Sequence, residues 1–271
     1  MSRMVGWVLG LAVALSAAPG LSSQYWVEYE PANGNFPEQE GWIRHTAHGP
    51  PDERWIEDGW LVLDGMTIPG VTDYYEMPMS GGLDPDPGEL FLLEWRIRVD
   101  ELFGYHDPTV GIYSDEKWAV GFMLSLSSID STFEPGLGAD FESGVPHTFE
   151  FRSWDMRTYV LSIDGVPAIE GNFWLSLTDS NVRWGDGVYP SGSLARWDYF
   201  RFGVVPGPLP GDVNCDGTVN FADINPFVQA LADGDAYQQM YPGCWPENAD
   251  INGDGSVDFG DINPFIEVLT S

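Results

Sequence analysis

The feature that most constrains this chain is a twelve-residue acidic pattern that occurs twice near its C-terminal end. The two copies begin at Asp212 and Asp250, 38 residues apart. Each has an oxygen-bearing side chain at positions 1, 3, 5, 9 and 12, and a glycine at position 6. Calcium takes six to eight hard oxygen ligands from a short flexible loop, and the glycine permits a sharp turn around the ion. The repeat therefore predicts two loops that bind one Ca²⁺ ion each. A solvated acidic loop pair that binds nothing is the alternative.

Each loop leads into a second repeated segment with helical character. Apolar residues recur at i, i+3, i+4 and i+7 from Ile224, and again from Ile262. Pro226 and Pro264 fall in the first turn, where a backbone N–H has no intrahelical partner. We therefore expect two amphipathic helices whose apolar stripes meet.

This duplicated loop–helix arrangement resembles a type I dockerin over about the last 60 residues. The chain shares the family's aspartate at position 12 and its lack of an entering helix. The resemblance implies a cohesin-like or cell-surface partner. It also implies two sets of calcium ligands, in which Thr218 and Ser256 contribute carbonyl oxygens: Asp212, Asn214, Asp216, Thr218, Asn220 and Asp223; and Asp250, Asn252, Asp254, Ser256, Asp258 and Asp261.

The chain departs from the family pattern at the positions that contact the partner. In type I dockerins, loop positions 10 and 11 often carry these contacts, commonly as a Ser/Thr pair. Here position 10 is Phe221 in the first loop and Phe259 in the second. We expect these rings either to contact the partner or to join the core of the module.

The N-terminal segment predicts export from the cell. Arg3 precedes an apolar run over residues 4–15 and small residues at 16–18. That pattern is typical of a secretory signal peptide and is too short to span a membrane. We assign residues 1–23 to it and expect a secreted or cell-surface protein with no membrane insertion. Cys215 and Cys244 suit an oxidising compartment and are expected to form a disulfide, two free buried thiols being the alternative.

The charge of the chain excludes partners that need a basic surface. The net charge is −31, and residues 207–271 contain no Lys, Arg or His. Phosphate binding requires a positive face, so we expect neither nucleic acid nor anionic membrane as a partner.

The region before the acidic repeat reads as β-structure. Alternating apolar and polar residues or apolar runs predict strands over residues 91–99, 118–126, 148–154, 159–163 and 194–205, and Asp164-Gly165 predicts a hairpin turn. Many short strands separated by turn residues suggest a jelly-roll β-sandwich. We therefore expect a mainly β sandwich domain over residues 24–205, a Pro/Gly linker over 206–211, and a small α-helical module over 212–271.

Three phrases of this region are similar to strands of concanavalin A-like and laminin G-like domains. They cover residues 147–152, 158–167 and 195–202. The similarity implies a jelly-roll fold, but a fold does not define a function.

Ten tryptophans lie in this region, and exposed indoles stack on sugar rings. We expect seven or eight to be core and take those beside turns, Trp55, Trp60 and Trp184, as candidates for exposure. The expected glycan contacts are Trp184 with Asp186 and Trp60 with Asp58. Each indole has a core position as its alternative.

No catalytic residue is assigned. A glycosidase needs two positioned carboxylates, and the Glu-x-Asp-x-x-Glu string of the glucanases with this fold does not occur. The favoured function is an exported, non-catalytic module that binds, or is displayed on, extracellular polysaccharide. A glycoside hydrolase or polysaccharide lyase with a divergent site, and a structural surface protein without a glycan ligand, remain the alternatives.

Overall fold

The computed structural model describes residues 25–67, 71–79, 83–86, 88–104, 107–188, 190–241 and 244–270. The expected signal peptide lies outside these residues. The chain divides into two compact units, one over residues 22–207 and one that takes in residues 208–271. No helix in the described ranges is long and apolar enough to cross a bilayer.

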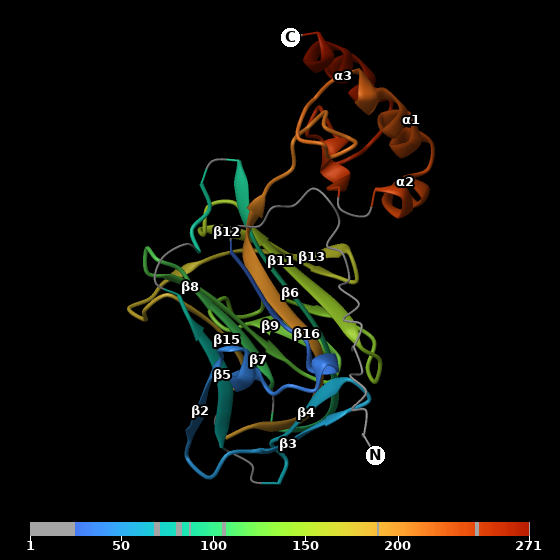
Figure 1. Ribbon diagram of the computed structural model, residues 1–271. Helices are drawn as coiled ribbons and strands as arrows, with labels where there is room; N and C mark the ends of the chain where they lie inside the picture. The colour runs from blue at the N-terminus through green and yellow to red at the C-terminus, as the bar shows by residue number, and fades with distance from the viewer. Residues whose placement is uncertain are drawn as a thin grey trace, which may run out of the picture. The chain divides into compact units, whose positions relative to one another are not determined.

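The first unit is a jelly-roll sandwich of two antiparallel sheets (Figure 1). In order across the first sheet, the strands are β13 (Val166–Asn172), β12 (Thr158–Ile163), β11 (His147–Ser153), β6 (Glu89–Phe103), β16 (Gly192–Pro206), β4 (Trp60–Asp64) and β3 (Glu53–Glu57), and β1 (Tyr25–Tyr29) also pairs with β16. Across the second sheet they are β10 (Gly138–Asp140), β9 (Ser128–Ser131), β8 (Trp118–Leu124), β7 (Thr109–Tyr113), β15 (Asn181–Asp186), β5 (Thr72–Pro78) and β2 (Ile43–Ala47), with β14 (Trp174–Leu175) paired to β8. Two short 3₁₀ turns, η1 (Pro31–Asn33) and η2 (Pro37–Glu40), follow β1.

The period-two patterns predicted the strands at the centre of the first sheet. β6 and β16 run side by side over their whole length, as β6 pairs with β16 from Glu89↔Pro206 to Phe103↔Gly192. The Asp164-Gly165 turn joins β12 to β13, and both residues have positive φ (52° and 81°), as a tight hairpin turn requires. The fold class expected from the sequence is confirmed.

The core lies between the sheets and is rich in aromatic rings. Of the nine indoles described in this unit, four are fully buried: Trp42, Trp95, Trp184 and Trp197. Trp118 is half-buried and packs against this core, Trp60 lies on the outer face, and three others, Trp55, Trp154 and Trp174, are exposed. The expectation of seven or eight core indoles is therefore too high. Phenylalanine takes much of the space instead, because Phe91, Phe122, Phe149, Phe151 and Phe200 are also fully buried.

The second unit is a small helical module with its own core. Its helices are α1 (Ile224–Ala232), α2 (Gly234–Met240) and α3 (Ile262–Leu269), with 3₁₀ turns η3 (Phe221–Asp223), η4 (Pro246–Asn248) and η5 (Phe259–Asp261). Phe227 of α1 and Phe265 of α3 meet with ring centroids 4.3 Å apart, so the expected contact between the repeats is confirmed.

The apolar stripes are only partly buried. Ile224 and Val228 on α1 and Ile262 and Ile266 on α3 are exposed, whereas the stripe pattern predicted that they would be covered. The sequence also did not predict α2. Its Tyr237 is buried, and the phenol donates a hydrogen bond to the carbonyl of Val213 (2.9 Å), which ties α2 to the first acidic loop.

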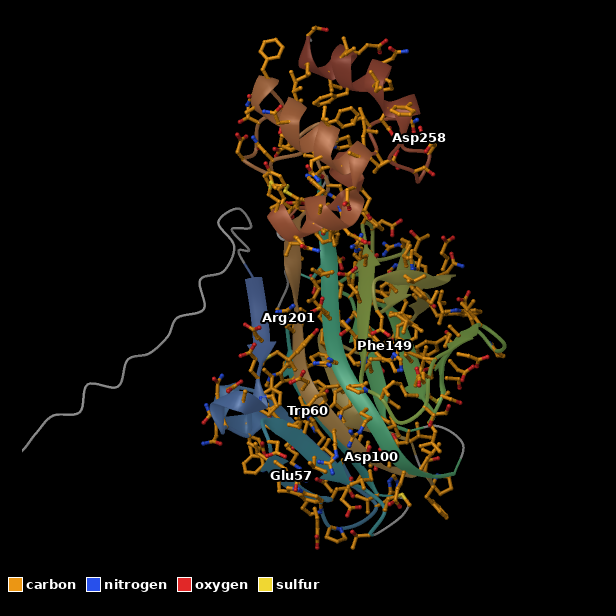
Figure 2. The ribbon with its side chains drawn as sticks, turned by 90° about the vertical axis from the view of Figure 1, so that its right-hand side faces the viewer. Glu57, Trp60, Asp100, Phe149, Arg201 and Asp258 are labelled. Atoms are coloured by element: carbon orange, nitrogen blue, oxygen red, sulfur yellow. A yellow bond between two sulfur atoms is a disulfide. The ribbon has the colours of Figure 1, made fainter. Side chains whose placement is uncertain are left out.

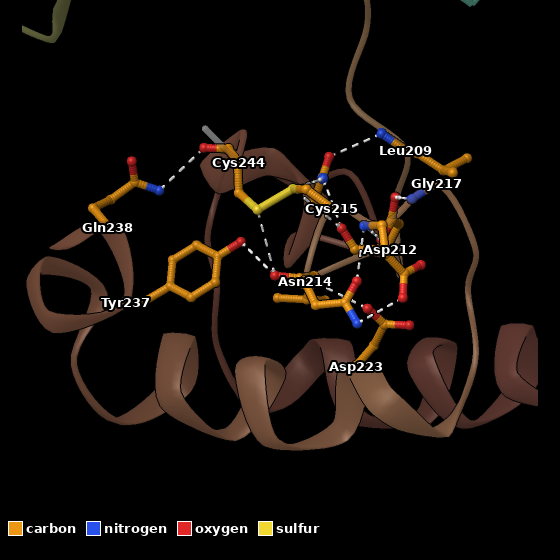
Figure 3. The surroundings of a disulfide bond; sticks show 12 residues. Leu209, Asp212, Asn214, Cys215, Gly217, Asp223, Tyr237, Gln238 and Cys244 are labelled. Atoms are coloured by element: carbon orange, nitrogen blue, oxygen red, sulfur yellow. Dashed lines mark hydrogen bonds between the residues drawn. A yellow bond between two sulfur atoms is a disulfide. The ribbon is translucent and has the colours of Figure 1, made fainter. Parts of the chain in front are cut away.

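The disulfide between Cys215 and Cys244 is formed, as expected (Figure 3). Asn248 provides a second link across the module. Its side-chain N–H donates to the carbonyl of Asp212 (2.8 Å), and its side-chain oxygen accepts from the N–H of Leu209 (2.8 Å). The start of the first loop is thus held against the segment that precedes the second.

Candidate functional sites

A groove at the β12–β13 edge of the first sheet is the candidate ligand site of the sandwich. Its volume is about 470 Å³, and it is lined by Trp154, Thr158, Tyr159, Val160, Glu170, Gly171 and Asn172. We call it the Trp154 groove. The residues come from the turn between β11 and β12 and from the two strands that follow.

The turn that carries Trp154 is fixed by side-chain hydrogen bonds. Asp155 accepts from the N–H groups of Arg157 (2.8 Å) and Thr158 (2.9 Å), and the hydroxyl of Ser153 accepts from the N–H of Met156 (2.9 Å). Burial raises the pKa of Asp155, but these N–H donors outweigh it and lower the pKa overall. The turn therefore holds an exposed indole, 43% accessible, beside an ionised carboxylate.

The floor of the groove requires a glycine. A Cβ at Gly171 would stand 2.7 Å from Oε2 of Glu134 and closer still to the Tyr159 hydroxyl. Glu134 accepts hydrogen bonds from the backbone N–H (3.3 Å) and the side-chain N–H (3.4 Å) of Asn172, so the amide is held in place. Glu170 is exposed and has no ion-pair partner among the described residues. An indole face, a free carboxylate and a fixed amide thus line one groove.

The outer face of the first sheet, which carries Trp60, is dominated by paired charges (Figure 2). Arg196 bonds to Asp100 (2.7 Å) and to Glu57 (2.7 Å), and Arg98 bonds to Asp100 (2.5 Å). Burial alone would raise the pKa of Asp100, but the two guanidinium groups outweigh it and lower the pKa. The pairing leaves little unopposed charge for a ligand.

Trp60 itself is half-buried on this face. The guanidinium of Arg96 lies 5.5 Å from the centroid of its ring. Asp58 is exposed in the turn between β3 and β4. Glycan contact by this pair stays a prediction. Trp55 on β3 is exposed, as its place beside a turn suggested.

The predicted glycan contact of Trp184 with Asp186 is wrong, because both side chains are buried. Trp184 has no exposed surface, and its ring centroid lies 4.7 Å from Trp197, 4.8 Å from Tyr75 and 5.2 Å from Phe200. The cause is the pleat of β15, which turns Val182, Trp184 and Asp186 inward and Arg183 outward. The Val-Arg-Trp alternation in the sequence was the signal that could have identified Trp184 as core.

A group of buried carboxylates lies at the end of the sandwich that β15 reaches. Asp186 opposes Asp73 in the β15–β5 register, Asp73 accepts from the N–H of Asp52 (2.7 Å), and Asp107 accepts from the N–H of Gly187 (3.2 Å). Asp73 is paired with Arg44. Both oxygens of Asp52 and Asp186 and one of Asp107 lack a hydrogen-bond partner within the described ranges. Reasoning from the sequence missed this group, because its members are far apart along the chain.

These carboxyls predict a stability that falls as the pH rises. Burial, helped by the nearby charge of Asp73, raises the pKa of Asp52 from 3.8 to about 7, and burial raises that of Asp107 well above its usual value. The folded state therefore binds these protons more tightly than the unfolded state. The stabilisation is complete below about pH 4 and is lost as the pH rises through about 7. Since one pKa unit corresponds to about 1.4 kcal/mol, we expect a loss of a few kcal/mol between pH 4 and 8.

Urea unfolding of the whole chain at fixed calcium, followed by tryptophan fluorescence, measures this loss. Asp52→Asn removes one titrating group with little change of shape and should flatten the pH profile. A free energy of unfolding that is constant or rises from pH 5 to 8 contradicts the prediction.

The two acidic loops of the tail fold in the same way, and Figure 3 shows Asp212, Asn214, Gly217 and Asp223 of the first. In the first, Asp212 accepts from the N–H groups of Asp216 (3.1 Å) and Gly217 (2.9 Å), and Asp223 accepts from those of Asn214 (2.9 Å) and Asn220 (2.8 Å). The second loop repeats all four bonds at 2.8–3.1 Å through the equivalent residues, which are Asp250, Asp254, Gly255, Asp261, Asn252 and Asp258. The glycines at position 6 both have φ of +86°.

The loops hold their position-12 carboxylates in the interior, since Asp223 and Asp261 are fully buried. The described parts of the chain contain no group of three or more His, Cys, Asp or Glu side chains that is arranged to hold a metal ion. Calcium binding by the loops therefore stays a prediction.

Comparisons with known proteins bear on the fold of the sandwich. No family model matches the chain. No curated protein sequence matches it either. A carbohydrate esterase of the Shiga toxin-encoding bacteriophage phi24B has a similar structure, with a TM-score of 0.50 and 11% identity over 69% of this chain and 100% of that one. At that identity the likeness shows the fold alone.

Two further solved structures resemble the chain less closely. Domain 4 of AbnA, an extracellular arabinanase from Geobacillus stearothermophilus in complex with arabinotriose, has a TM-score of 0.45 and 12% identity over 69% of this chain and 94% of that one. A β-glucanase from Bacillus licheniformis has a TM-score of 0.42 and 12% identity over 69% of this chain and 99% of that one.

Proposed function

We propose that the sandwich binds polysaccharide in the Trp154 groove. The observation that carries this proposal is the exposed indole of Trp154 in a groove that also presents Glu170 and Asn172. An aromatic face contacts the C–H groups of a sugar ring, while a carboxylate accepts and an amide donates hydrogen bonds to its hydroxyls. The phage esterase, whose fold is similar, acts on carbohydrate by its description, which supports the ligand class only by analogy.

Replacing Trp154 by alanine tests the site. We expect retention on a polysaccharide affinity gel to fall at least tenfold, because the ring provides the apolar contact area. The melting temperature should change little, since nearly half of the side chain is accessible. Trp55→Ala is the matched control, because Trp55 is also exposed but lies on β3, away from the groove. Equal binding by Trp154→Ala and the unaltered protein counts against this site, and release of reducing sugar would favour the hydrolase alternative.

We also propose that the tail is a calcium-loaded docking module. The supporting observation is the set of four equivalent hydrogen bonds in the two acidic loops, together with the equal φ of their position-6 glycines. The twelve residues named from the sequence would hold two Ca²⁺ ions. Bound calcium would offset the mutual repulsion of carboxylates that have no basic residue near them in the sequence.

The docking surface we propose centres on Phe221 and Phe259. These rings are 73% and 83% exposed, so they are not part of the core of the module. Large exposed apolar side chains in equivalent places of a repeat suit contact with another protein, here a cohesin-like or cell-surface partner. The disulfide agrees with an extracellular location, which also supplies calcium.

A further inference from the structure

We propose that the Trp154 groove selects an extended polysaccharide chain without anionic groups, and that Trp174 forms a second stacking position for that chain. This inference rests on the proposed binding of polysaccharide in the groove. It adds the charge class of the ligand and a binding residue beyond the groove lining.

The charge class follows from the cations on the strands that build the groove. Arg152 is paired with Glu150 (2.7 Å), and Arg157 is paired with Glu116 while its guanidinium lies 4.5 Å from the centroid of the Trp118 ring. His147, the remaining basic residue of β11–β13, is buried and bonds to Asp164 (2.6 Å). None of these three groups is available to bind a uronate, sulfate or phosphate on a ligand.

The carboxylates in and beside the groove would repel an anionic ligand. Glu170 has no ion-pair partner among the described residues, and Asp155 stays ionised beside Trp154. Residues 147–172 contain four acidic residues and two arginines, a net charge of −2, in a chain of net charge −31. An anionic chain would therefore meet repulsion without a compensating ion pair, whereas an uncharged hydroxyl is a suitable donor to Glu170, the carboxylate that lines the groove.

Trp174 extends the aromatic surface beyond the groove. β13 ends at Asn172, and the next residue, Phe173, is buried and donates its N–H to the carbonyl of Arg157 in the turn after Trp154 (2.8 Å). Trp174 follows in β14, which pairs with β8 of the second sheet, and is 48% exposed. An exposed indole therefore lies two residues beyond the amide of the groove. Leu175 and Leu177, which follow Trp174, are also exposed. Two exposed indoles, one in the turn before β12 and one in β14 just after β13, suit a ligand several sugar units long better than a single sugar.

The decisive experiment compares polymers that share a backbone but differ in charge. Hydroxyethyl cellulose and carboxymethyl cellulose form one such pair, and methyl-esterified and de-esterified pectin form another. Neutral xylan, mannan and arabinan broaden the panel. Binding of the full chain is measured by sedimentation or pull-down in 0.15 M and 1 M NaCl, because the Debye length falls from about 8 Å to about 3 Å between these conditions.

We expect at least one uncharged polymer to be bound and the anionic member of each pair to bind at least tenfold more weakly at both salt concentrations. Recovery of anionic binding in 1 M NaCl would assign the discrimination to the overall charge of the protein and overturn the selective role of the groove. Preference for an anionic polymer overturns the inference while the proposed function stands. Binding to no polymer of the panel overturns both.

Variants test the second stacking position separately. With an oligosaccharide series from the polymer that binds, Trp154→Ala should weaken every length, whereas Trp174→Ala should weaken only the longer members, by about fivefold or more. Trp55→Ala again serves as the control. Unchanged affinity of Trp174→Ala for the longest chains refutes the role of Trp174.

Discussion

Replacing Trp184 by alanine is expected to lower the free energy of unfolding of the sandwich by about 3–5 kcal/mol, the range for a fully buried large aromatic side chain. The indole has no exposed surface and contacts the rings of Trp197, Tyr75 and Phe200 at centroid distances of 4.7–5.2 Å. These rings come from both sheets, so the cavity left by the substitution would lie where the two sheets meet. Urea unfolding of the whole chain, followed by fluorescence, measures the change.

Trp184→Phe and Trp154→Ala are the matched controls. Phenylalanine retains part of the buried area and should cost less than alanine, while Trp154→Ala removes an exposed indole and should stay within about 0.5 kcal/mol of the unaltered protein. A loss below about 1 kcal/mol for Trp184→Ala would show that this indole does not hold the sheets together.

Trp184 also shows where reasoning from the sequence fails. Its neighbours Gly185 and Asp186 resemble a turn, and that resemblance suggested exposure. In the structure β15 instead extends through Asp186, so the period-two alternation of the strand points the Trp184 side chain inward. Strands with strong alternation, such as β6 and β11, were predictable because successive side chains in a strand point to opposite faces of the sheet.

The groove was not predictable at the same level. Trp154 follows the last residue of β11, and its exposure depends on a turn fixed by Asp155 and Ser153. Its partners Glu170 and Asn172 are brought beside it only by the pairing of β12 with β13. The turn residue Asp155 next to Trp154 was a usable local signal, but the groove also required the register of a hairpin whose bulge falls at Leu161 and Ser162.

The sequence predicted more of the tail than of the sandwich, because the tail contains a repeat. The positions of α1 and α3 and the Phe227–Phe265 contact follow from the duplicated pattern, whereas the disulfide was expected from the two cysteines and the predicted export. The exposure of Ile224 and Ile262 was missed, because the module is too small to cover both sides of two short helices. Exposed apolar residues on both helices lie close in sequence to Phe221 and Phe259, which is why the docking surface is placed there.

Removal of calcium is expected to unfold the tail while the sandwich stays folded. The two loops contain seven aspartates, and residues 207–271 contain no basic residue to offset them. Asp223 and Asp261 are fully buried, and a buried carboxylate is costly unless its charge is compensated. Because a site of this kind forms only in the folded state, the free energy of binding the ions would contribute directly to the stability of the module.

Hydrogen exchange of the whole chain, read by mass spectrometry with and without a calcium chelator, measures this effect. We expect amide protection in α1 and α3 to fall by at least a hundredfold on chelation and to return with calcium, while β6 and β16 are unchanged. Asp216→Ala with Asp254→Ala should lose protection even with calcium present. Phe221→Ser with Phe259→Ser alters exposed rings outside the ligand set and should keep the calcium response but lose capture of the partner. If protection in α1 and α3 is the same with and without chelator, the loops do not depend on calcium, because a module that needs the ions to offset its buried carboxylates cannot remain closed without them.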